Sequence, residues 1–179
     1  MIRSMRFIIL AGIYNSGPKH WQTEWQTEDD RFIKLDHSNW DQPDRLVWVN
    51  ELEKNLAVLK DDVILVAHSL ACLMVIHWAN QSRLKVRGAL LVSVPDPYGA
   101  SFPNAARNFE NVPMSPLPFP SIVVASQNDP YGTLAHMTNC AAAWGSKLKQ
   151  VGFLGHINAD SGLSNWPEGK LVLNELIEG

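Results

Sequence analysis

The chain has few cysteines and little charge imbalance. Only two of its 179 residues are cysteines, Cys72 and Cys140, and both fall on expected helices. Two cysteines do not make a disulfide framework, so we expect a reducing, cytoplasmic compartment. The net charge of −3 offers no basic surface, so nucleic acid is not an expected partner.

Long apolar runs and metal-ligand spacings are also missing. The longest apolar runs are far shorter than a membrane span, so no membrane partner is expected. Phe7–Leu10 predicts a short strand rather than the core of a signal peptide. The six histidines are scattered, with no H-E-x-x-H and no C-x-x-C, so we expect neither a metal site nor a cofactor.

What the chain does contain is typical of one folded domain. It is 46% hydrophobic and 18% charged, and its length suits a single domain over residues 1–179. Apolar runs predict strands at Arg6–Ala11, Arg31–Leu35, Asp62–Ala67, Val86–Val94, Ser121–Ala125 and Leu148–Phe153. Helices are expected at His20–Gln26, Pro43–Leu59, Leu70–Gln81, Thr133–Trp144 and Pro167–Glu178.

This alternation of strands and helices predicts the α/β class. Consecutive β-α-β units favour right-handed crossovers and a parallel sheet with helices on both faces. We therefore expect a compact α/β fold with a mostly parallel, six-stranded sheet and no full lid domain.

The stretch Val63–Ala71 reads Val-Ile-Leu-Val-Ala-His-Ser-Leu-Ala and carries the strongest functional signal. A buried strand runs directly into Ser69, and a helix follows at once. This is the layout of a nucleophile elbow, in which small residues two positions before and after the serine relieve crowding. Here those residues are Ala67 and Ala71. Serine also caps helices for structural reasons, so the fragment alone leaves that reading open.

Two further side chains follow expected strands in the order that a Ser–Asp–His triad requires. Asp129 comes after the strand Ser121–Ala125, and His156 comes after the last strand. A serine hydroxyl needs a base, and the base needs an orienting carboxylate. Taken singly, Asp129 before a proline could start a turn, and His156 could be an ordinary loop histidine. Taken together with Ser69, each at the carboxyl end of a strand, they predict a catalytic triad. The chain order Ser, Asp, His is that of the α/β-hydrolases, so we expect a compact α/β-hydrolase fold.

The oxyanion hole of such a site needs two backbone N–H donors. We expect one from Leu70, directly after the nucleophile, and one from Ile13 in the loop after the first strand. Gly12 allows close backbone approach, although it could simply make a turn. Residues expected to line the pocket are Gly12, Tyr14, Asn15, His68 and Tyr131.

The segment Pro95–Pro120 contains seven of the eleven prolines and breaks the alternation. It could form a small flap over the site or an ordered connection without a role. Among the tryptophans, Trp25 is expected in the core, while Trp21 and Trp166 could lie either in the core or in an acyl pocket.

The sequence resembles the small single-domain serine hydrolases of the retinoblastoma-binding protein 9 type. The resemblance covers nearly the whole chain and rests on four stretches. They are Asn15–Gln22 with Trp25, Val66–Leu70, Asn128–Tyr131, and Gly155–Gly162 with Trp166–Gly169 behind it. It implies that the family's triad corresponds to Ser69, Asp129 and His156.

The sequence therefore predicts a serine hydrolase that cleaves a small ester, thioester or amide through an acyl-enzyme. Its expected partner is a small acyl substrate, and the sequence leaves the question of a protein partner open. Two alternatives stay open. One is a non-catalytic binding or scaffold protein on a hydrolase fold, favoured by the alanines of the elbow and the bulky Ile13-Tyr14 loop. The other is a serine peptidase or acyltransferase that uses the same residues.

Overall fold

The computed structural model describes residues 4–59 and 62–178. Its centre is a six-stranded sheet with the order β2-β1-β3-β4-β5-β6. The strands are β1 (Met5–Leu10), β2 (Phe32–Lys34), β3 (Asp62–His68), β4 (Gly88–Val92), β5 (Ser121–Ala125) and β6 (Lys147–Gln150). All five strand pairings are parallel, so the sheet is wholly parallel rather than mostly so.

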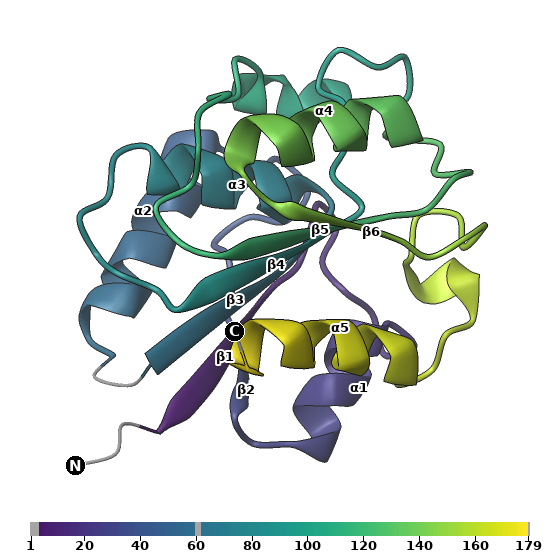
Figure 1. Cartoon of the computed structure of the whole chain (residues 1–179). Coiled ribbons are helices and arrows are strands. Elements are labelled where there is room, and N and C mark those ends of the chain that lie inside the picture. Colours follow the sequence, from purple (N-terminus) through teal and green to yellow (C-terminus); the bar gives the residue numbers. More distant parts are fainter. Residues whose placement is uncertain (1–3, 60–61, 179) are drawn as a thin grey trace.

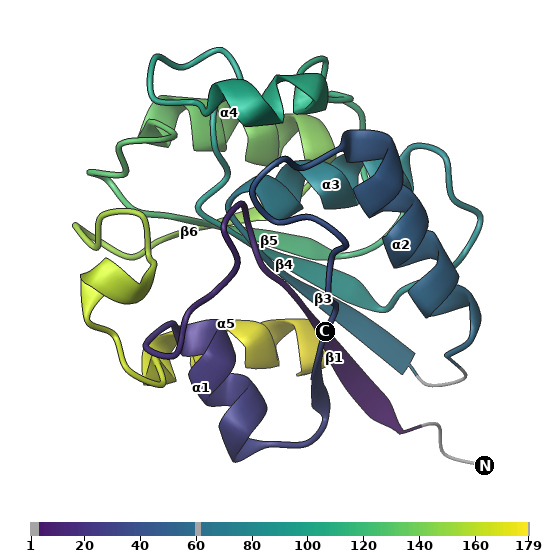
Figure 2. The same ribbon diagram turned by 180° about the vertical axis from the view of Figure 1, so that it is seen from behind.

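Helices cover both faces of this sheet (Figure 1). On one face lie α2 (Arg45–Ala57), α3 (Leu70–Ala79) and α4 (Leu134–Trp144), and on the other lie α1 (Trp21–Glu28) and α5 (Pro167–Glu178). Figure 2 shows the same two layers from behind. Each face has its own apolar cluster, and α3 is buried from Leu70 to Trp78 because it packs between the sheet and its neighbours.

The structure confirms the predicted elements and shifts several of their ends. The helix expected from His20 begins at Trp21, because the His20 ring caps it and accepts a hydrogen bond from the N–H of Gln22. The helix expected from Pro43 begins at Arg45, because Asp44 accepts from the N–H of Val47. Thr133 likewise caps α4 rather than starting it.

Three predicted strands are shorter in the structure, and the first of them, Arg31–Leu35, forms a strand only over Phe32–Lys34. The run Val86–Val94 forms a strand only over Gly88–Val92. The strand predicted at Leu148–Phe153 lies instead at Lys147–Gln150. Gly152 has a positive φ of 79°, which turns the chain away from the sheet and leaves the Phe153 side chain exposed.

The tryptophans left open in the sequence belong to the core. Trp21, Trp25 and Trp166 are at most 1% exposed and contact one another with ring centroids 4.6 to 6.2 Å apart. The prediction for Trp25 is therefore confirmed, and Trp21 and Trp166 lie under the site rather than in an acyl pocket.

The proline-rich segment between β4 and β5 is anchored to the body of the molecule. Its only helix in the described chain is the short 3-10 helix η1 (Asn104–Phe109). Phe102, Ala106 and Phe109 are buried in the same apolar cluster as α2 and α3. The segment is thus an ordered connection, and part of it also reaches the pocket described below.

Candidate active site

Ser69 sits on a strained turn between β3 and α3. Its φ of 57° and ψ of −127° lie outside the region that residues with side chains prefer. Such strain is held only where the surrounding structure enforces it, and it is found most often at functional sites. The turn places the hydroxyl at the carboxyl end of the sheet.

The three predicted triad residues meet at this edge. Ser69 Oγ lies 2.8 Å from His156 Nε2, and His156 Nδ1 lies 2.8 and 3.0 Å from the two carboxylate oxygens of Asp129. An ionised carboxylate can only accept, so Nδ1 carries the ring hydrogen and Nε2 is left to accept from the serine hydroxyl. The arrangement has the geometry that a nucleophile, a base and an orienting carboxylate require.

Asp129 is held without exposure to solvent. Its side chain is 0% exposed, and one of its oxygens also accepts a hydrogen bond from the N–H of Tyr131 at 2.9 Å. The Tyr131 ring lies 4.5 Å from the His156 ring, centroid to centroid. Asp129 therefore has a fixed geometry toward His156, which is what selecting one histidine tautomer requires.

The loop that carries His156 is tied to the body of the molecule at several points. His68 Nε2 donates to the His156 carbonyl at 2.8 Å, and Trp21 Nε1 donates to the Ile157 carbonyl at 2.8 Å. Asn128 Oδ1 accepts from the N–H of Gly155 at 2.8 Å. His68 thus holds the backbone of His156 in place. Burial lowers the pKa of His68 well below its ordinary range, so the His68 ring is neutral.

Leu70 and Ile13, whose backbone N–H groups are expected to form an oxyanion hole, both lie at the cavity beside Ser69. Leu70 is the first residue of α3, where the helix leaves its N–H without a helical partner. The N–H of Ile13 makes no hydrogen bond within residues 4–59 and 62–178. Gly12 brings the two loops together, since a Cβ there would lie 2.9 Å from Ser69 Cβ and 3.4 Å from Leu70 N.

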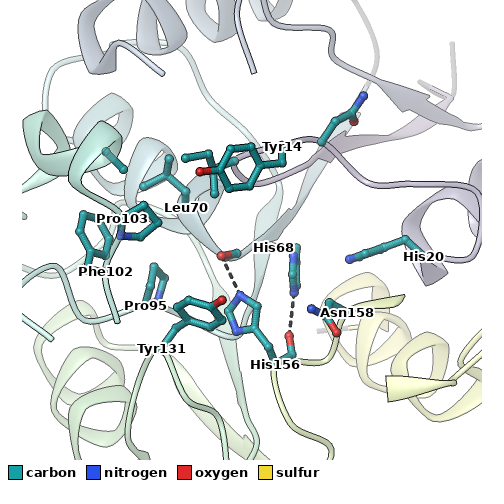
Figure 3. Close-up of a pocket in the computed structure, with 14 residues that line it drawn as sticks. Tyr14, His20, His68, Leu70, Pro95, Phe102, Pro103, Tyr131, His156 and Asn158 are labelled. Carbon is teal, nitrogen blue, oxygen red and sulfur yellow. Dashed lines mark hydrogen bonds between the residues drawn. The ribbon is translucent and has the colours of Figure 1, made fainter. Parts of the chain in front are cut away.

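A cavity of about 170 Å³ opens beside Ser69 (Figure 3). All but one of the expected pocket residues line it; Gly12 lies against the elbow behind it. The sequence did not single out six further lining residues: His20, Pro95, Phe102, Pro103, Ala106 and Asn158. His20 and Asn158 fall within the stretches that carry the family resemblance, and the other four belong to the proline-rich segment. The sequence therefore marks both regions, but it does not predict that these six residues line the pocket.

A metal centre has no counterpart among these residues. In the part of the chain that the structure describes, no three His, Cys, Asp or Glu side chains gather as a metal site would require. Nor does any helix there have the length and apolar character to cross a membrane.

A parallel sheet with a serine elbow and this strand order defines the α/β-hydrolase class. The chain belongs to the serine hydrolase family, whose model matches residues 7–175. No curated protein matches the sequence.

Solved structures agree with this assignment. A protein described as a YdeN-like hydrolase from Pectobacterium atrosepticum is 30% identical, with a TM-score of 0.88 over 98% of this chain and 91% of that one. The ydeN gene product of B. subtilis is 21% identical, with a TM-score of 0.75 over 98% and 100% of the two chains. The type II thioesterase BorB is 14% identical, with a TM-score of 0.68 over 97% and 92%. The last two similarities show the fold alone.

Proposed function

We propose that this serine hydrolase cleaves a small ester, thioester or amide through a Ser69–His156–Asp129 triad. The observation that carries the proposal is the chain of short contacts from Ser69 Oγ through His156 to Asp129. His156 takes the hydroxyl proton as Ser69 attacks the carbonyl, and then gives it to the leaving group. Water, activated by the same base, hydrolyses the acyl-enzyme.

The oxyanion donors complete this scheme. The N–H groups of Leu70 and Ile13 stabilise the negative charge that develops on the carbonyl oxygen. Asp129 keeps the His156 ring in the tautomer that accepts the serine proton and stabilises the imidazolium that forms.

We also propose a narrower placement of the chain. The stretches Asn15–Gln22 and Gly155–Gly162 support the retinoblastoma-binding protein 9 type within the serine hydrolases. The buried, unpaired thiols of Cys72 and Cys140 support a reducing compartment such as the cytoplasm. Residues 1–179 are proposed to form one domain.

The test is labelling with a fluorophosphonate, which modifies activated serines, combined with hydrolysis of p-nitrophenyl butyrate. We expect wild type to be labelled and active and Ser69→Ala to lose both properties while keeping its circular dichroism spectrum. Ser115→Ala, an exposed serine far along the chain, is the matched control and should behave as wild type.

Absence of labelling in the folded wild-type protein would contradict the proposal and favour the binding-protein alternative. Labelling without ester hydrolysis would instead direct attention to amides and to acceptors other than water.

A further inference from the structure

His20 is a buried histidine whose hydrogen position the structure determines. The residue is 4% exposed, and its Nδ1 accepts a hydrogen bond from the N–H of Gln22 at 3.2 Å. Burial, with smaller contributions from the charges of Lys34 and His156, lowers its pKa to about 3. The ring is therefore neutral at physiological pH, and because Nδ1 accepts, its hydrogen is on Nε2.

This Nε2–H donor has no acceptor within the described residues. A buried donor without a partner is unfavourable, so such groups are rare unless a water or a ligand completes them. His20 lines the cavity, and its ring extends from the start of α1 toward His68, with ring centroids 4.7 Å apart. His68 in turn lies 4.9 Å from the His156 ring, so only one ring separates His20 from the base.

Asn158 supplies a second donor at the same end of the cavity. Its Oδ1 accepts from the N–H of Asp160 at 3.1 Å, which fixes which way the amide faces. The Nδ2 group makes no hydrogen bond within the described chain, and in Figure 3 it lies on the side facing His68. Two neutral donors therefore line the same end of the cavity.

The opposite end of the cavity is apolar. Figure 3 shows Pro95, Phe102 and Pro103 on the other side of His156 from His20 and Asn158. No Lys, Arg, Asp or Glu lines the cavity among the described residues. A charged group bound here would lose its hydration without gaining an opposite charge, which disfavours ionic substrates.

We propose that the site takes an uncharged acyl compound with two unlike arms. A short apolar arm lies against Phe102 and Pro103. The other arm carries a carbonyl or ether oxygen that accepts hydrogen bonds from His20 and Asn158. This inference rests on the proposed function, because both arms extend from the carbonyl that Ser69 attacks.

The test compares esters that differ only by an oxygen acceptor. One pair is p-nitrophenyl 4-oxopentanoate against 4-methylpentanoate, which places the acceptor in the acyl arm. The other is acetonyl butyrate against isobutyl butyrate, which places it in the alcohol arm, with the released acid followed by titration. The ratio of kcat/KM within each pair is the readout, and comparing variants with wild type cancels the intrinsic reactivity of each ester.

Two variants remove one donor each and keep the local fold. His20→Asn retains an oxygen that caps α1 but removes the Nε2–H, and Asn158→Asp retains Oδ1 but removes the Nδ2–H groups. We expect each variant to lower roughly tenfold, in one of the two pairs, the ratio of kcat/KM for the ester with the oxygen acceptor to kcat/KM for the ester without it. His37→Asn, a matched change at a buried histidine beside α2 and outside the cavity, should keep the wild-type ratio.

If the kcat/KM ratios of both pairs are the same in wild type and in both variants, the two-arm substrate is overturned. The proposed function still stands in that case, provided that hydrolysis depends on Ser69. If the folded wild-type protein shows neither ester hydrolysis nor fluorophosphonate labelling, the proposed function and the two-arm substrate are both overturned. If one variant fails to fold, as judged by thermal unfolding, the other still decides the question.

Discussion

At the scale of single residues, Gly12 approaches the serine turn so closely that no side chain fits between the two loops. A Cβ at this position would lie 2.9 Å from Ser69 Cβ and 3.2 Å from the carbonyl oxygen of His68. Neither atom belongs to the end of a flexible side chain, so the loops would have to move apart. Glycine here allows the loop that carries Ile13 to lie close to Ser69.

We therefore predict that Gly12→Ala lowers kcat/KM for p-nitrophenyl butyrate roughly a hundredfold, because small displacements of a reacting group are costly. Gly17→Ala is the matched control, since a Cβ there meets nothing within 4 Å. It should retain wild-type activity. Wild-type rates in Gly12→Ala would mean that the two loops separate without disturbing the oxyanion donors.

At the scale of elements, η1 and α2 are joined by one asparagine. Asn108 Oδ1 accepts from the N–H of Arg45 at 2.7 Å, and Asn108 Nδ2 donates to the carbonyl of Pro43 at 3.0 Å. The start of α2 is thus capped twice, by Asp44 from its own chain segment and by Asn108 from the proline-rich segment. This link holds the apolar wall of the cavity against α2.

We predict that Asn108→Ala lowers the free energy of unfolding by about 1 kcal/mol, the usual effect of losing a helix cap. Urea denaturation measures this directly. Asn104→Ala on the same short helix loses only a surface contact to Arg107 and should change stability far less. If the two variants lose the same free energy of unfolding, the cap from Asn108 contributes no more to stability than the surface contact of Asn104.

The sequence located the elements better than their ends. The apolar strands that precede Ser69 and Asp129 could be recognised because these central strands are buried on both faces and carry continuous hydrophobic runs. The edge strand β6 carries Lys147 and Lys149 instead. The apolar residues that predicted a strand therefore extend past its end, as far as Phe153.

The polar end of the cavity could not be predicted from sequence for a different reason. His20 was recognised only as part of a motif, because its missing hydrogen-bond partner depends on what surrounds it in three dimensions. The same holds for Asn158, whose donor faces the cavity only because Asp160 fixes its amide.

At the scale of the whole molecule, the protein keeps several histidines neutral by burial. Burial is the largest cause that lowers the pKa of four of them below the ordinary value of about 6.5: His20, His37, His68 and His77. In the unfolded chain these rings take up protons as the pH falls below that value, whereas in the folded protein they stay neutral to lower pH. Their contribution to stability is therefore fully present above pH 6.5 and decreases as the pH falls, for His20 down to about pH 3.

We predict that the free energy of unfolding falls between pH 6.5 and 5 by up to about 1.4 kcal/mol per pH unit for each such histidine. Urea denaturation at a series of pH values measures the slope. His77→Gln keeps a donor for the Phe109 carbonyl but does not titrate, so it should reduce the slope by one histidine's share. A stability that is flat over this range would contradict the prediction.

The wide separation in sequence of the residues around Ser69 has a consequence for how the molecule becomes active. Ser69 and His156 are 87 positions apart, and the strands that precede them, β3 and β6, are separated in the sheet by β4 and β5. Closing such distant contacts is slow, and it requires most of the sheet to be in place first. Recovery of catalysis after dilution from denaturant would therefore lag behind recovery of helical content. The rate at which activity returns would then report the last step of folding.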